Sequence, residues 1–155
     1  MKGRLVMKYE YMNFMIDEEK EHQNGVYLMS DGEDNYIGKA HRDRGFKQRY
    51  GSYVHNKEYD KKDCSGDKLF QSEESAAMYE LYSTKCRFED ECEELESYFI
   101  RMYNKVHPDK KLINEKVPKK VKTVFDKEVE QYFTEDHEIN LELMMDLGLM
   151  EQVEL

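Results

Sequence analysis

Two short triplets of similar composition stand on either side of one turn, and they constrain the fold more than any other feature. Gly-Val-Tyr occupies 25–27 and Tyr-Ile-Gly occupies 36–38, with an Asp-Gly pair at 31–32 between them. β-Branched and aromatic residues flanking an Asp-Gly pair are a strong short-range signal of a β-hairpin. Residues 25–40 are therefore expected to form two antiparallel strands.

The length of the turn decides which residues face each other across the hairpin. A two-residue turn at Asp31 and Gly32 places Tyr27 directly opposite Tyr36. A four-residue loop over 31–34 places the tyrosines on a diagonal, still on one face, because side chains alternate along a strand. Both turns predict an aromatic pair on one face of the hairpin.

Alternation and helical periodicity predict the other elements. A helix is expected over 88–106, where apolar residues recur in steps of three and four until Pro108 ends the pattern. The remaining expectations are an edge strand or cover over 5–16, a helix over 42–56, a loop over 57–75, a strand over 76–86, and helices over 120–133 and 138–153. The predicted fold class is α/β of the α+β kind, a small three-stranded, mostly antiparallel sheet flanked by helices, with a helical acidic C-terminal extension.

Charge is distributed unevenly along the 155 residues, a length that suits one domain with an appendage. The net charge is −10, yet nine acidic and no basic residues lie in 128–155, so the first 127 residues are close to neutral. Basic residues dominate 39–62 and 101–127, and both stretches could face a polyanion. The mean hydropathy of −0.97 and the lack of a long apolar run predict a cytoplasmic protein with no membrane segment.

Four motifs in order resemble one known family. They are GVY at 25–27, YIGKA at 36–40, RYGSY at 49–53 and LESYFI at 95–100. With their expected strand, helix and helix contexts, they are similar to the GIY-YIG nuclease domain, found in homing endonucleases and phage endonucleases.

The resemblance implies a domain over 24–115, preceded by a strand or cover segment over 1–23 and followed by the acidic extension over 116–155. It implies a metal-dependent endonuclease that hydrolyses DNA phosphodiester bonds with a divalent metal as cofactor, Mg²⁺ or else Mn²⁺. The implied setting is the cytoplasm of a bacterial or phage-infected cell. DNA is the implied partner, and the C-terminal helices are candidates for a homodimer or protein contact.

The resemblance also assigns site residues by position. They are Tyr27, Tyr36, Lys39, Arg49, Tyr53, Glu96 and Asn114, with Glu96 as the metal ligand. Alternatives stay open for three of them: Arg42 or Arg44 for the arginine, Glu91 for the acid and Asn104 for the asparagine.

These residue types suit phosphodiester hydrolysis, which builds negative charge on phosphate oxygens. Arg49 would clamp the phosphate through its planar fork of donors. Tyr27 is the favoured general base and Tyr36 its orienting partner, provided that Lys39 and Arg49 lower the phenol pKa from about 10. Helical geometry places Glu96 at the edge of the apolar stripe, from which a carboxylate can reach a cleft.

DNA contacts are expected from basic side chains around the site. They are Arg42, Arg44, Lys47, Lys110, Lys111, Lys119 and Lys120. A different class of function fits the same scaffold: a catalytically silent binding or inhibitor protein whose acidic tail mimics nucleic acid or docks on a partner.

Overall fold

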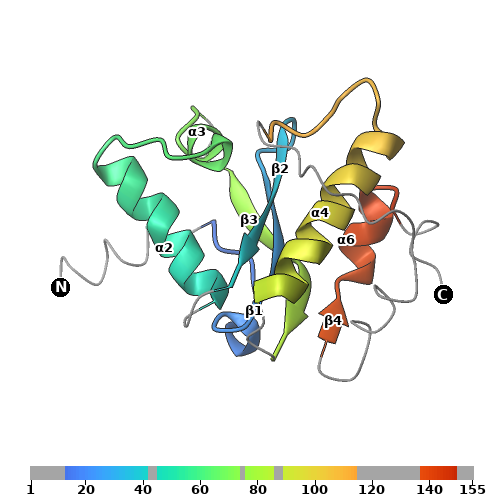
Figure 1. Ribbon diagram of the computed structural model, residues 1–155. Coiled ribbons are helices and arrows are strands. Elements are labelled where there is room, and N and C mark those ends of the chain that lie inside the picture. Colours follow the sequence, from blue (N-terminus) through green and yellow to red (C-terminus); the bar gives the residue numbers. More distant parts are fainter. Residues whose placement is uncertain (1–12, 42–44, 74–75, 86–88, 115–136, 150–155) are drawn as a thin grey trace.

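A computed structural model shows a central sheet with helices on both faces (Figure 1). The structure describes residues 13–41, 45–73, 76–85, 89–114 and 137–149. The helix expected over 120–133 lies outside these residues. No helix within them is long and apolar enough to cross a membrane.

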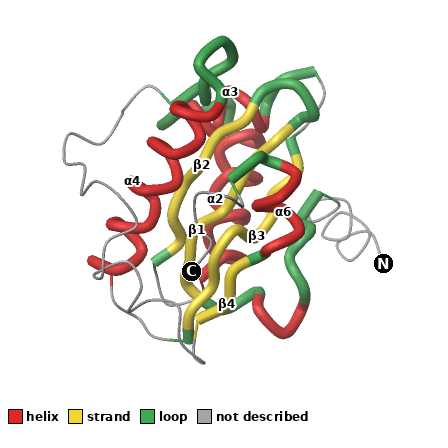
Figure 2. The backbone as a smooth tube through the Cα atoms, turned by 90° about the vertical axis from the view of Figure 1, so that its right-hand side faces the viewer, coloured by secondary structure: helices red, strands yellow, loops and turns green. Residues whose placement is uncertain are grey.

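The sheet has four strands, all paired antiparallel, in the order β2-β1-β3-β4 (Figure 2). Their bounds are Asn24–Ser30 for β1, Asn35–Ala40 for β2, Ala77–Thr84 for β3 and His137–Ile139 for β4. The first three strands confirm the predicted α+β class and its antiparallel sheet. The short β4 is an addition to the three strands expected from the sequence.

The hairpin closes with the longer of the two loops considered. Ser30 pairs with Asn35, which leaves four residues, 31–34, in the loop. The Asp31 carboxylate accepts hydrogen bonds from two backbone N–H groups of the loop, at 2.7 and 2.8 Å, and so stabilises it. The two-residue turn is therefore wrong, and the two tyrosines lie on a diagonal of one face.

Two pairs of helices cover opposite faces of the sheet (Figures 1 and 2). They are α2 (Gly45–Glu58) with α3 (Ser65–Phe70), and α4 (Glu89–Val106) with α6 (Leu141–Asp146). Alternation along β1 supplies both cores, because Val26 and Leu28 pack with α4 while Tyr27 and Met29 pack with α2. Each strand residue therefore serves one face only.

The segment 57–75, expected to be a loop, contains α3. Its first turn is capped by Cys64 and Asp67 in a reciprocal arrangement, and the Asp67 carboxylate also accepts from the backbone N–H of Asp63 at 2.9 Å. A capping box built on cysteine, followed by glycine in the first turn, lacks the usual Ser/Thr signal. This explains why the sequence pattern hides the helix.

The helix predicted over 88–106 is confirmed as α4. Cys92, Leu95 and Phe99 of the predicted stripe are fully buried. Tyr98 and Ile100 are buried as well, because α4 packs against both the sheet and the C-terminal segment. The buried face is thus wider than the stripe alone predicts.

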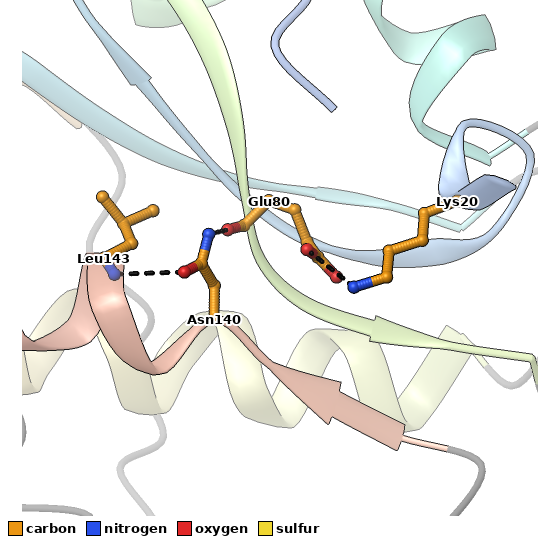
Figure 3. Close-up of polar contacts among 4 residues, drawn as sticks. All are labelled: Lys20, Glu80, Asn140 and Leu143. Atoms are coloured by element: carbon orange, nitrogen blue, oxygen red, sulfur yellow. Dashed lines mark hydrogen bonds and ion pairs between the residues drawn. The ribbon is translucent and has the colours of Figure 1, made fainter. Parts of the chain in front are cut away.

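The single helix expected over 138–153 is wrong, since β4 and the short α6 occupy its place. Asn140 explains the break (Figure 3). Its amide donates to the carbonyl of Glu80 at 2.9 Å and accepts from the N–H of Leu143 at 3.1 Å, while its own backbone N–H donates to Leu81 at 2.9 Å. One side chain therefore caps α6 and fastens it to β3.

Segments before β1 pack along β3. Phe14 forms an isolated parallel bridge with Met78, in the described part of the segment expected to be a strand or cover. The short 3-10 helix η1 (Glu18–Lys20) brings Lys20 Nζ to 3.4 Å from the largely buried Glu80 carboxylate (Figure 3). The N-terminal segment thus contacts β3 on its α2 side.

Candidate active site

A cavity of about 630 Å³ lies where β2, α2 and α4 come together. Five of the residues predicted for the site line it: Tyr27, Tyr36, Lys39, Arg49 and Glu96. They come from both strands of the hairpin and from two helices on opposite faces of the sheet. The structure therefore brings together side chains that are distant in the sequence.

Tyr27 lines the cavity, and Gly38 lies directly opposite it on β2. A Cβ atom at position 38 would lie 2.3 Å from the Tyr27 hydroxyl oxygen. Only glycine leaves room for the phenol at this position. Tyr36 packs beside the same ring, with 6.4 Å between ring centroids. The second triplet thus supplies one tyrosine and the space that the other occupies.

Tyr53 lies beneath the cavity and holds Arg49 in place with Tyr27. The two tyrosine hydroxyls are hydrogen-bonded to each other, and both side chains are fully buried. Arg49 Nε donates to the Tyr27 hydroxyl at 3.1 Å and Nη2 donates to the Tyr53 hydroxyl at 3.3 Å. Among the described residues, no hydrogen bond of the Arg49 Nη1 group is found, so its donors remain for a ligand.

Cys64 belongs to the same group of side chains, which the sequence did not suggest. Arg49 Nη2 donates to its sulfur at 3.6 Å, and the thiol donates to Asp67 at 3.6 Å. The N-terminal cap of α3 therefore supports the guanidinium from behind. The sequence could have indicated Cys64 only as the N-cap of α3, and cysteine is not a usual N-cap residue.

Burial sets the protonation of the phenols. Burial raises the pKa of Tyr27, and the opposing effect of the nearby Arg49 charge does not offset it. The pKa of Tyr53 and that of Tyr36 are raised for the same first reason. Arg49 does act to lower the pKa of these phenols, but burial outweighs it, so in the protein alone the tyrosines are neutral hydrogen-bonding groups.

Lys39 and Glu96 face each other across the α4 side of the cavity. Lys39 follows Ile37 by two residues and shares its face, which packs on α4. Its Nζ lies 3.8 Å from the Glu93 carboxylate, one helical turn before Glu96. Burial raises the pKa of Glu96 to about 7, against the lowering effect of Lys39, while Glu93 adds a smaller rise. Near neutral pH, Glu96 is therefore partly protonated.

A divalent cation would find few protein ligands in this cavity. Within the described residues there is no group of three or more His, Cys, Asp or Glu side chains placed to hold a metal. Mg²⁺, however, commonly binds through one or two carboxylates and takes water and substrate phosphate as its other ligands. Glu96, a carboxylate within the cavity wall, fits that pattern.

Asn114 lies outside the cavity, on the free edge of β2. Its Oδ1 accepts from the Ile37 N–H at 3.1 Å and its Nδ2 donates to the Ile37 carbonyl at 2.8 Å. The side chain thus takes the place of a neighbouring strand. Asn104, the alternative, accepts from the N–H of Leu112 at 3.0 Å and so fixes the turn that leads to Asn114. Both asparagines position β2 rather than face the cavity.

The predicted DNA-binding residues are spread over the surface. Lys47 lies on α2 and pairs with Glu21 at 3.5 Å, away from the cavity lining. Lys110 and Lys111 are exposed in the turn after α4. The others, Arg42, Arg44, Lys119 and Lys120, lie outside the described residues. The structure therefore does not test Arg42 or Arg44 as an alternative to Arg49.

Further polar residues of the cavity were not singled out from the sequence. They are Gln48, Ser52 and His55, which share one face of α2. The spacing of four and three residues along α2 was a usable signal, but the apolar stripe of the same helix has the same period. Periodicity alone does not separate the two faces.

No family model, no curated protein and no solved structure matches the chain. The cavity and its residues therefore carry the functional argument by themselves.

Proposed function

We propose that this protein is a metal-dependent endonuclease that hydrolyses DNA phosphodiester bonds at an active site of GIY-YIG type. The observation that supports the proposal is the joint lining of one cavity by two tyrosines, a lysine, an arginine and a glutamate. DNA in the cytoplasm of a bacterial or phage-infected cell is the proposed substrate. A single cavity cuts one strand at a time, so both strands require a second copy or a second visit.

Arg49 is the proposed phosphate clamp. Its Nε and Nη2 groups are fixed by Tyr27, Tyr53 and Cys64, so the guanidinium loses little conformational freedom when a ligand binds. Since it also lines the cavity, the Nη1 donors can meet two oxygens of a phosphate. The tyrosines thus act first by orienting the arginine.

Lys39 is the second cation of the site. Its contact with the exposed Glu93 is long, at 3.8 Å, and exposed ion pairs contribute little to stability. Because Lys39 lines the cavity, its ammonium can also contact a phosphate bound there. Lys39 then stabilises the charge that develops on the phosphate during hydrolysis.

Glu96 is the proposed ligand of the divalent cation, because it is the acid that lines the cavity on the α4 side. When bound, the cation would act as a Lewis acid on the phosphate and would lower the pKa of nearby phenols. Tyr27 and Tyr36 are the candidates to accept the proton of the attacking water. Their raised pKa explains why neither is ionised in the protein alone.

Cleavage of supercoiled plasmid tests the proposal. We expect the wild-type protein to nick or linearise plasmid with Mg²⁺ or Mn²⁺ and to stop when EDTA removes the metal. Glu96→Gln and Arg49→Ala should each lower the rate by about a hundredfold or more, as the loss of one preorganised electrostatic group does in other enzymes. The rate is followed by agarose gel electrophoresis.

Two variants with the same chemical change serve as controls. Glu58→Gln at the exposed end of α2 and Arg101→Ala on α4 lie outside the cavity lining and should leave the rate unchanged. A wild-type protein that cuts with neither metal would contradict the proposal and favour the silent binding or inhibitor protein. Equal cutting by Glu96→Gln would contradict the assigned site.

A further inference from the structure

Residues of α2 beyond Arg49 also line the cavity, and one of them contacts an exposed aromatic side chain. Ser52, His55 and Asn56 line this part of it. The His55 ring contacts the Tyr59 ring, with 4.6 Å between centroids and an angle of 44° between planes. Tyr59 is 62% exposed, and no other aromatic side chain of the described residues appears among the exposed large hydrophobic ones.

The backbone holds this aromatic pair at a fixed place. The Tyr59 N–H donates to the His55 carbonyl at 3.1 Å, so the last turn of α2 continues to Tyr59. Asp60 then takes a left-handed conformation, with φ of 53°, and the Lys61 N–H returns to the Asn56 carbonyl at 2.7 Å. The two rings therefore sit on a capped helix end rather than on a free loop.

The distance from the phosphate clamp to the aromatic pair matches a few nucleotides. A helix rises 1.5 Å per residue, so Arg49 and His55 are about 9 Å apart along the axis of α2. A stacked nucleic acid strand advances about 3.4 Å per nucleotide, and an unstacked strand advances further. A strand with its phosphate at Arg49 would therefore bring a base to His55 within about three nucleotides.

The chemistry of this part of the cavity suits a base better than a phosphate. The lining here includes the neutral hydrogen-bonding side chains of Ser52 and Asn56 and the carboxylate of Asp63. Asp63 also accepts a hydrogen bond from Asn56 at 3.2 Å. A carboxylate repels phosphate, whereas carboxylate and amide groups can bind the edges of bases.

We propose that His55 and Tyr59 form a stacking site for an unpaired nucleobase, which makes DNA with an unpaired nucleotide near the cleaved bond the preferred substrate. An aromatic surface binds any base, because every base has a π face, but only when the base is not stacked within a duplex. This inference rests on the proposed function, since it assumes a phosphate at Arg49. To the proposed DNA substrate it adds a preference for DNA that contains an unpaired nucleotide.

Binding to labelled oligonucleotides in EDTA tests the inference with full-length protein and without cleavage. The three ligands are a short single strand, a blunt duplex and a duplex with a single-stranded flap, each with 2-aminopurine at the unpaired position or its paired equivalent. Fluorescence anisotropy gives Kd, and 2-aminopurine emission reports stacking. We expect wild-type protein to bind the flap about tenfold or more tightly than the blunt duplex.

Tyr59→Ala should weaken binding to the flap and to the single strand by about five- to a hundredfold, with little change for the blunt duplex. Tyr59→Phe keeps the ring and should bind like wild type. Met145→Ala, a change of an equally exposed side chain on α6, is the control. A wild-type preference for blunt duplex, or an equal loss on all three ligands with Tyr59→Ala, would overturn the inference.

Failure of this inference can be told apart from failure of the proposed function. Plasmid cleavage with no effect of Tyr59→Ala on the flap preference removes the stacking site alone. A flap preference that depends on Tyr59 without any cleavage keeps the stacking site and removes the hydrolysis.

Discussion

The phenol ring of Tyr27 occupies the space in which any residue other than glycine at position 38 would place its side chain. The direct pairing of these two residues across the hairpin requires this arrangement. Arg49 reaches Tyr27 from α2 and is held there by two hydroxyls. Contacts between single residues thus shape the cavity. The effect of burial on one residue, Glu96, gives the most direct test.

The raised pKa of Glu96 predicts a stability that falls as pH rises. The folded protein disfavours the carboxylate, so from about pH 4.5 to about pH 7 the folded state binds more protons than the unfolded state. Without metal, Glu96→Gln should therefore be more stable than wild type by about 1 to 3 kcal/mol at about pH 8 and nearly equal to it at about pH 4. Urea unfolding at both pH values measures the difference.

The exposed Glu58→Gln is the matched control, and its effect should vary little with pH. Added Mg²⁺ should raise the unfolding temperature of wild type and not that of Glu96→Gln. If Glu96→Gln increased the free energy of unfolding equally at both pH values, burial would not disfavour the ionised Glu96 carboxylate.

Among the elements, β2 decides the geometry of the cavity because it lies at the edge of the sheet. It carries Tyr36, Gly38 and Lys39, and of the strands that the structure describes β1 alone pairs with it. Asn114 supplies the missing partner on the outer side through two hydrogen bonds to Ile37. The segment after α4 therefore helps to position β2, and with it the cavity residues on β2, although Asn114 does not line the cavity.

Asn114→Ala should loosen β2. It removes both hydrogen bonds to the Ile37 backbone, which costs about 1 to 3 kcal/mol in the free energy of unfolding. Amide hydrogen exchange should be faster at Ile37, and cleavage should slow because Lys39 loses its fixed position. The exposed Asp109→Ala in the same turn should change neither quantity. Unchanged exchange at Ile37 would show that β2 does not depend on Asn114.

At the scale of the whole molecule, the C-terminal segment 137–149 contributes to the hydrophobic core. Met144 and Leu149 are fully buried against α4 and the sheet, and β4 extends the sheet beyond β3. His107 also bonds the Leu147 carbonyl at 2.7 Å, which joins the end of α4 to the end of α6. Removing residues 137–149 would therefore expose core residues of α4 and the sheet.

Two adjacent methionines test this role of the C-terminal segment. Met144 is fully buried and Met145 is 61% exposed. Met144→Ala should lower the free energy of unfolding by about 2 to 5 kcal/mol, whereas Met145→Ala should change it by less than about 0.5 kcal/mol. Denaturant unfolding of the two variants gives both values. Similar values for both would contradict the packing of α6.

Local patterns determined much of the fold. The Asp-Gly turn between two β-type triplets predicted β1 and β2, and the steps of three and four residues predicted α4, because both signals depend on neighbours along the chain. The same patterns did not reveal α3, whose cap is a cysteine, nor the break at Asn140. These features depend on partners such as Asp67 and Glu80, and the second of these lies far away in the sequence.

The sequence by itself determined which side chains are candidates for the cavity, since the ordered triplets, Arg49 and Glu96 are read directly from it. Only the tertiary structure decided that Tyr53 lies beneath the cavity, that Asn114 braces β2 from outside, and that the phenols are neutral in the protein alone. The physical reason is burial. The cost of placing a charge away from water depends on everything packed around it, and no local pattern in a chain contains that information.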